Sequence, residues 1–244
     1  MKYTMLFFFS SLLLFSQESK LKVKLNNITT LLINAKNTEY FINYEITNTT
    51  NNEISFFLIP NALIANAASS GTLFMVYKMY QNGLFEDMDG PFFEYGSDDV
   101  IELATIEDKN SEKYKLLLQK IIDKNKVKFL DIKLKYNIKS DNDAEISWAF
   151  RNYLLVNSII KLNPNETRKF TIKTLWDKNR FVKNDDLEYY LDENKKIEIE
   201  LILQLNKKVF KDRLSTQEYK AIETDENFIE GDFKSNKLEV KFDE

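Results

Sequence analysis

The sequence predicts a mainly β protein in which short strands pack as a sandwich and a helix is inserted between them. Three observations lead to this fold class. Apolar and polar residues alternate in many short stretches, turn-forming residues separate these stretches, and helical spacing is clear in one long stretch. With 43% hydrophobic residues, the chain can build its own core, which it needs because it has no cysteine and therefore no disulfide.

The first 16 residues are expected to be a signal peptide. Lys2 precedes an apolar run from Met5 to Phe15, which suits the hydrophobic segment of such a peptide. The run is shorter than the roughly 20 residues that cross a bilayer, and no later run is long enough to do so. We place the cleavage after Ser16, which leaves residues 17–244 as a single domain. The sequence therefore predicts an exported protein, periplasmic or secreted.

The first strands are predicted from alternation. Residues 21–25 have the pattern of a strand with one wet face, and residues 39–60 contain two alternating stretches around an Asn-rich turn at 48–52. This arrangement predicts a hairpin or a sandwich corner, because Asn tolerates the left-handed backbone of such turns. The pair Asn82-Gly83 predicts a second hairpin.

The remaining elements include one amphipathic helix. Residues 111–123 place five apolar side chains on one helical face: Tyr114, Leu117, Leu118, Ile121 and Ile122. Alternation then predicts strands at 130–138, 145–150, 197–205 and 238–242, and a hairpin at 158–176. Short helices are expected after the caps at Asn184–Asp186 and at Ser215, where Glu218 completes a capping box.

Two segments carry a resemblance to a known class of domains. The stretch YEITNTTNNEISFFL (44–58) resembles the early strands of secreted bacterial immunoglobulin-like domains. The stretch LNPNETRKFTI (162–172) is similar to their Pro-Gly-Glu bend, with Asn165 where Gly usually stands. The resemblance implies an immunoglobulin-like antiparallel β-sandwich that serves as a binding, spacing or accessory module. It assigns no functional residue, and both cysteines of antibody-type domains are absent.

Composition excludes several chemistries. The chain has no histidine and no cysteine, which excludes Ser-His-Asp triads, His-based zinc sites and thiolate chemistry. It has five glycines and no Gly-rich phosphate loop. The net charge is −4 and charges of both signs are mixed, so no nucleic-acid footprint is visible. Lys supplies 30 of the 34 basic residues, and Asn, Ile and Phe are abundant, which indicates a bacterium with an AT-rich genome.

The most unusual stretch is FEDMDGPFFEYGSDD (85–99). Its aromatic residues Phe92, Phe93 and Tyr95 are candidates for a contact surface with a protein or a sugar ring. Alternatively, the phenylalanines fold back as a plug on the end of the sandwich. The 14% aromatic content of the whole chain favours the plug.

The acids of the same stretch raise the question of a Ca²⁺ site. An EF-hand register with Gly90 at position six puts Phe85 at position one and Gly96 at position twelve, so that motif fails. A looser oxygen site stays open, although clustered acids in a turn are usually only solvated. Its candidate ligands are Asp87, Asp89, Glu94, Asp98 and Asp99.

The leading prediction is an exported, non-catalytic binding or accessory protein whose partner is a protein or a glycan. No cofactor, nucleic acid or membrane span is expected for the mature chain. One alternative is a carboxylate-dependent, carbohydrate-active enzyme, although no pair of acids stands out. Another is a structural part of a cell-surface assembly, in which an exposed strand edge pairs with a neighbour.

Overall fold

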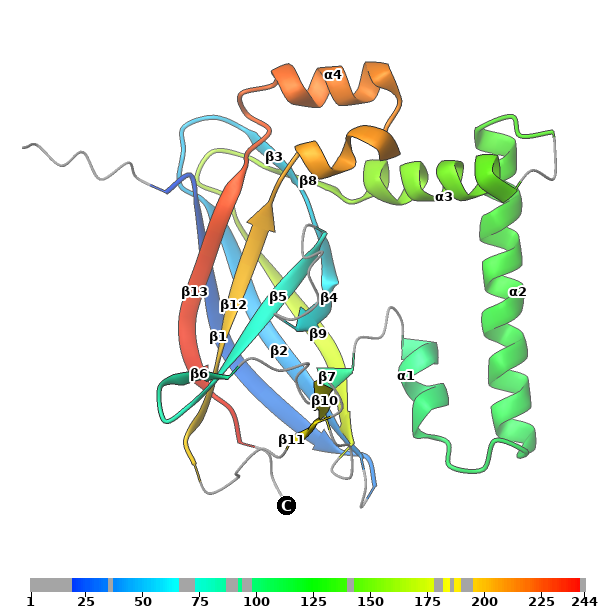
Figure 1. Cartoon of the computed structure of the whole chain (residues 1–244), viewed down its shortest axis with the longest axis vertical. Helices are drawn as coiled ribbons and strands as arrows, with labels where there is room; N and C mark the ends of the chain where they lie inside the picture. The colour runs from blue at the N-terminus through cyan, green and yellow to red at the C-terminus, as the bar shows by residue number, and fades with distance from the viewer. Residues whose placement is uncertain are drawn as a thin grey trace, which may run out of the picture.

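The computed structural model describes residues 19–34, 37–65, 73–86, 92–93, 98–139, 143–177, 182–184, 187–189 and 195–241. More of these residues lie in strands than in helices, which confirms the prediction of a mainly β protein. The strands form one body, and a group of helices stands beside it (Figure 1). The predicted signal peptide, residues 1–16, lies outside the described residues.

The first sheet is antiparallel and has four strands in the order β1-β2-β9-β7. Its strands are β1 (Leu21–Leu32), β2 (Asn37–Asn48), β9 (Thr167–Asp177) and β7 (Phe92–Phe93). Alternation decides which face is inside: Leu21, Val23 and Leu25 are buried, whereas Lys22 and Lys24 between them are exposed.

The second sheet has five strands, with the path β13-β12-β5-β4 and β6 paired to β5. These are β4 (Ile59–Ala65), β5 (Phe74–Gln81), β6 (Leu84–Glu86), β12 (Ile197–Leu205) and β13 (Gly231–Glu239). The pairing of β4 with β5 is parallel, so the expectation of purely antiparallel pairing is wrong here.

The two sheets share one hydrophobic core. It combines inward side chains of both sheets, among them Tyr40, Ile42 and Ile172 from the first, and Met75 and Leu201 from the second. The edge strands β1 and β13 also contact one another. There Asn236 bridges the sheets: its Oδ1 accepts from the Leu25 backbone N–H (3.0 Å) and its Nδ2 donates to the Leu25 carbonyl (3.1 Å).

Two short strands pair with one another outside the two main sheets. After β2 the chain turns into β3 (Ile54–Phe57), and β8 (Ile159–Leu162) leads into β9; β3 and β8 pair with one another. Residues 39–60 therefore form a corner rather than a hairpin. The predicted hairpin at 158–176 is wrong, because its two strands pair with different partners. The bend between them is present, with Asn165 in a left-handed conformation (φ 59°).

Asparagine supplies the left-handed turns that the glycine-poor chain needs. In the described residues, the non-glycine positions with positive φ are Asn82, Asn137 and Asn165. Asn82 and Gly83 (φ 50° and 83°) form the predicted turn between β5 and β6, and Gln81 pairs with Leu84. The second predicted hairpin is thus confirmed.

The helices depart most from the expected pattern. They form α1 (Asp98–Thr105), α2 (Glu112–Lys135) and α3 (Asp143–Asn157), here called the helical arm. The predicted helix at 111–123 is present and begins at the N-cap Ser111, whose side chain accepts from the Tyr114 N–H (3.2 Å). However, it continues to Lys135, so the strand predicted at 130–138 is wrong. The strand predicted at 145–150 is part of α3.

The helical arm has a small core of its own, which explains why residues 130–138 are helical at their start and do not form the predicted strand. Ile132, Ile138 and Ala149 are buried together where α2 meets α3. Asn137 ends α2 in a Schellman motif, in which Ile138 N–H donates to the Lys133 carbonyl (2.9 Å) and Asn137 N–H to the Leu134 carbonyl (3.2 Å). Alternate residues of 130–138 thus lie on different helix faces instead of on one strand face.

The arm is attached to the β body at both of its ends. α1 contacts β9, and α3 contacts a 3-10 helix, η1 (Lys208–Arg213), that is followed by α4 (Thr216–Thr224). In Figure 1, α2 runs alongside the β body while η1 and α4 lie at one end of it. The capping box of Ser215 and Glu218 at the start of α4 is confirmed.

One more correction concerns the residues after β9. The short helix expected after Asn184–Asp186 is absent from the described residues there, where β10 (Val182–Asn184) and β11 (Leu187–Tyr189) pair antiparallel. Within the described ranges, no helix has both the length and the apolar character needed to cross a membrane.

Candidate functional site

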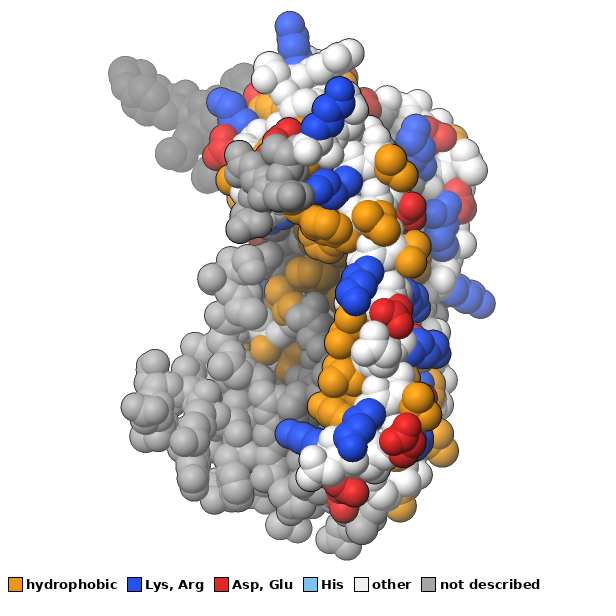
Figure 2. Space-filling view, turned by 90° about the vertical axis from the view of Figure 1, so that its right-hand side faces the viewer, with side chains coloured by type: hydrophobic (Ala, Val, Ile, Leu, Met, Phe, Trp, Pro, Cys, Tyr) orange, Lys and Arg blue, Asp and Glu red, His pale blue; other side chains and the backbone are white. Residues whose placement is uncertain are grey.

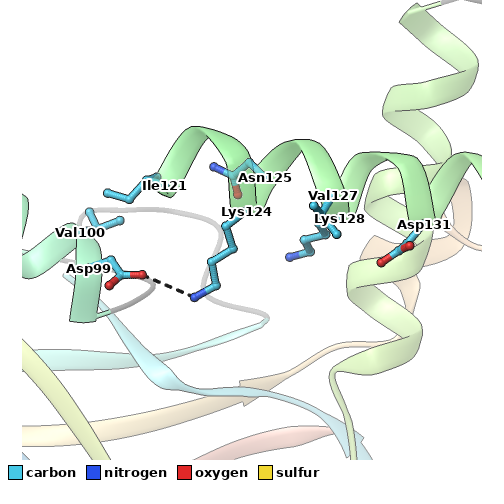
Figure 3. Close-up of a pocket in the computed structure, with 8 residues that line it drawn as sticks. All are labelled: Asp99, Val100, Ile121, Lys124, Asn125, Val127, Lys128 and Asp131. Atoms are coloured by element: carbon cyan, nitrogen blue, oxygen red, sulfur yellow. Dashed lines mark ion pairs between the residues drawn. The ribbon is translucent and has the colours of Figure 1, made fainter. Parts of the chain in front are cut away.

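A groove of about 520 Å³ lies between α1 and α2. Figure 3 shows its lining residues, which come from the start of α1 and from the middle and second half of α2. They are Asp99, Val100, Ile121, Lys124, Asn125, Val127, Lys128 and Asp131. Aliphatic side chains alternate with charges of both signs, and none of the lining residues is aromatic.

Ion pairs hold α1 against α2 at one edge of the groove. Lys120 Nζ lies 2.7 Å from Asp99 Oδ1, and Lys124 Nζ lies 3.6 Å from Asp99 Oδ2, the pair drawn in Figure 3. A third pair joins Lys113 to Glu102 at 3.0 Å. The hydrogen bond from Lys120, together with the positive charges of both lysines, holds the pKa of the Asp99 carboxyl below its usual range. The same hydrogen bond raises the pKa of Lys120, so both groups stay charged near neutral pH.

The outer surface of α2 is unusually apolar for an exposed helix. Of its 24 residues, only Leu117 and Ile132 are buried. Seven of the thirteen exposed large hydrophobic residues in the described part of the chain lie on it: Leu116, Leu118, Ile122, Val127, Phe129, Leu130 and Leu134. Figure 2 shows hydrophobic side chains gathered along this helix, with Lys and acidic side chains between them. Such a concentration on one element indicates a contact surface.

The structure places the residues singled out in the sequence as follows. Asp99 lines the groove, and Asp98 is the first residue of α1. Phe92 and Phe93 form β7, whose backbone pairs with Trp176 and Leu175 of β9. Tyr95, Asp87, Asp89 and Glu94 lie outside the described residues. The binding role of the aromatic residues therefore stays a prediction.

The calcium hypothesis also stays a prediction. Within the described ranges, no three His, Cys, Asp or Glu side chains lie together as a group able to hold a metal ion. Asp99, the one described candidate with a placed side chain, is already neutralised by two lysines. Any calcium site would therefore depend on the acids at 87–94 and on Asp98.

The groove residues of α2 beyond Ile121 were missed in the sequence because the predicted helix ended at residue 123 and residues 130–138 were assigned to a strand. A signal for them was present. Ile121, Asn125 and Lys128 follow one another at spacings of four and three, which places them on one helical face.

Comparison of the chain with protein-family models, with curated proteins and with solved structures found no match.

Proposed function

We propose that the protein is an exported, non-catalytic binding or accessory protein that holds a protein partner in the groove between α1 and α2. The observation that carries this proposal is the helical arm itself. Its longest helix stands beside the β body with seven exposed large hydrophobic residues and a groove of about 520 Å³ at its side. Burial of that apolar surface by a partner would be favourable.

A protein partner fits the groove better than a glycan does. Sugar rings are held by aromatic stacking and by planar polar groups, whereas the groove offers the aliphatic side chains Val100, Ile121 and Val127. The charges around them, Lys124 and Lys128 with Asp99 and Asp131, suit a partner that carries both signs. Apolar side chains together with charged ones are the usual composition of a protein interface.

The groove has two carboxylates, Asp99 and Asp131, and Asp99 is held in ion pairs with Lys120 and Lys124, which favours binding over carboxylate catalysis. Glu39 is the one acidic residue among the buried polar residues in the described part of the chain. It forms an ion pair with Lys173 at 2.9 Å, an arrangement with an evident structural role. Glycoside hydrolysis needs two carboxylates that face each other across a substrate.

The export prediction rests on the apolar run Met5–Phe15 behind Lys2. The immunoglobulin-like character of the β body is likewise our proposal. It is supported by the contact between the two segments that carry the resemblance. Asn48, in the first, donates from Nδ2 to the carbonyls of Leu162 (3.2 Å) and Asn163 (2.9 Å), in the second.

The experiment is affinity capture with the mature chain, residues 17–244, from the culture of its own organism. Wild type is compared with Lys128→Glu, which reverses a charge in the groove, and with Asn125→Arg, which fills it; both positions are exposed. We expect both variants to lose at least about tenfold in recovery of a specific protein, equivalent to about 1.4 kcal/mol of binding free energy.

The matched control is Lys220→Glu, the same charge change at an exposed lysine of α4. It should recover the partner as wild type does. Equal recovery by the groove variants and the control, or recovery of a glycan instead of a protein, would contradict the proposed site.

A further inference from the structure

A second feature of α2 is an apolar seam along its length. Leu116, Val127, Leu130 and Leu134 are 63%, 59%, 59% and 80% exposed. Together with Lys120 and Asp123, they occupy positions 116, 120, 123, 127, 130 and 134, which are spaced four and three residues apart in alternation. This is the spacing of the contact positions in a two-helix coiled coil. Val127 lies where the seam meets the groove.

The seam is long enough for a helix–helix interface. From Leu116 to Leu134 it extends over about 27 Å of helix, at 1.5 Å per residue. α2 is capped at both ends, by Ser111 and by the Schellman motif at Asn137, so its full length is presented as a regular helix.

The charges of the arm differ strongly between its two ends. Residues 98–111, which comprise α1 and its connection to α2, contain five acids and one lysine, a net charge of −4, whereas the first half of α2 (112–123) has a net charge of +1. Residues 124–135, the second half of α2, contain five lysines and one aspartate, a net charge of +4. Two parallel copies of α2 would bring equal charges together. Two antiparallel copies would bring the basic end of each beside the acidic end of the other.

We propose that a second copy of this chain packs on the seam, with the two α2 helices antiparallel. The interface is isologous, so every contact occurs twice. With Leu116 opposite Leu134 of the second copy, Asp123 lies opposite Val127 and within reach of the second copy's lysines. Lys120 lies opposite Leu130, against which its aliphatic stem packs while the ammonium group keeps its ion pair with Asp99.

Both the charge pattern and the helix dipoles favour this direction, since antiparallel dipoles attract. A different acidic protein or an anionic lipid surface would also meet lysines and leucines on α2. A second copy is favoured because the arm itself carries the complementary acidic surface. The inference does not rest on the proposed function: the seam shares Val127 with the groove, and its other residues lie outside the groove.

The first test is the molar mass of the mature chain by light scattering from about 1 to about 200 μM, a range that covers ordinary protein–protein affinities. We expect a dimer at the upper end. Leu130→Lys and Leu134→Lys should each weaken the dimer at least tenfold, with circular dichroism unchanged because both side chains are exposed. Leu84→Lys, at a 72% exposed leucine of β6, is the matched control and should leave the dimer intact.

The second test determines the direction of the helices. The chain has no cysteine, so single-cysteine variants form unambiguous disulfides. A mixture of Leu116→Cys and Leu134→Cys should give a disulfide-linked heterodimer upon oxidation, whereas Leu116→Cys alone should not link to itself. A monomer at every concentration, a prominent 116–116 link, or a monomer that binds anionic vesicles through Leu130 and Leu134 would overturn the proposal. Loss of partner capture with an intact dimer would affect the proposed function alone.

Discussion

Asn152 donates a hydrogen bond from Nδ2 to Oε2 of Glu218 (2.8 Å) and so joins α3 to α4. The Asn152 side chain is fully buried, and its Oδ1 accepts from the hydroxyl of Tyr136, at the end of α2 (2.6 Å). Glu218 accepts in addition from Ser215, through the backbone N–H (2.9 Å) and the hydroxyl (2.6 Å). A continuous chain of hydrogen bonds therefore connects the helical arm to α4, at the end of the β body.

The replacement Asn152→Ala should destabilise the protein by about 2 kcal/mol, because it removes the partner of the partly buried Tyr136 hydroxyl and one of the hydrogen bonds to the Glu218 carboxylate. The measurement is urea unfolding followed by circular dichroism. Hydrogen exchange in α3 should accelerate as well, since this contact fixes the arm.

The control for this prediction is Asn157→Ala on the same helix. Asn157 is exposed and donates only to the Tyr153 carbonyl within its own helix (2.7 Å). Its loss should change the stability by less than about 0.5 kcal/mol. Equal effects of the two replacements would mean that the connection between α3 and α4 contributes little.

Acid should weaken the same junction. Burial raises the pKa of the Glu218 carboxyl, but hydrogen bonds from Ser215 and Asn152 outweigh burial and hold it below the ordinary value of 4.5. A carboxyl with a lowered pKa in the folded state stabilises that state above its ordinary pKa, and this contribution is lost as the pH falls through the folded value. Glu218→Gln should therefore flatten the pH dependence of stability between about pH 5 and about pH 3.

Chemical unfolding at several pH values measures this effect. Glu226→Gln, at an exposed position just after α4, is the control and should keep the slope of wild type. If wild type and Glu218→Gln lose stability in parallel as the pH falls, the Glu218 contacts are not the source of the acid sensitivity.

Asn48 is the residue that links the corner after β2 to the end of β8 through its side chain. Its side chain is fully buried, its Nδ2 donates to the carbonyls of Asn52, Leu162 and Asn163, and its Oδ1 accepts from Thr50 N–H. Asn48→Ala should therefore lower the free energy of unfolding by about 2–3 kcal/mol, because it removes the hydrogen bonds of a fully buried side chain all at once.

Thermal unfolding is a suitable measurement, with a decrease in Tm of about 2–4 °C for each kcal/mol in a chain of this size. Asn51→Ala, at an exposed position in the same turn, should change Tm by about 1 °C or less. A wild-type Tm for Asn48→Ala would show that the turn forms without this side chain.

Local sequence patterns predicted the elements in which the spacing of apolar residues fits only one type of secondary structure. In 21–25, Lys and apolar residues alternate without helical spacing, and the structure has a strand with its lysines exposed. The turn at Asn82-Gly83 and the capping box of Ser215 and Glu218 were also predictable, because each depends on the conformation of neighbouring residues.

The segment 124–138 could not be assigned in this way. Leu130, Ile132 and Leu134 alternate like a strand, but they also fit two faces of a helix. Ile132 is buried against Ala149, whereas Leu130 and Leu134 are 59% and 80% exposed, which no strand with one buried face would produce. The groove residues on this half of α2 were missed for the same reason.

The sequence by itself determined a mainly β chain with its own core, the sites of several turns and the start of the long helix, because short-range periodicity and turn chemistry encode these features. Only the tertiary structure decided that 130–135 and 143–157 are helical, that the segments around Asn48 and Asn163 form a corner, and that α1 and α2 enclose a groove. The physical reason is that these choices depend on partners far away in the chain. Asn152 reaches Glu218 over 66 residues and Asn48 reaches Leu162 over 114, and no local pattern contains such contacts.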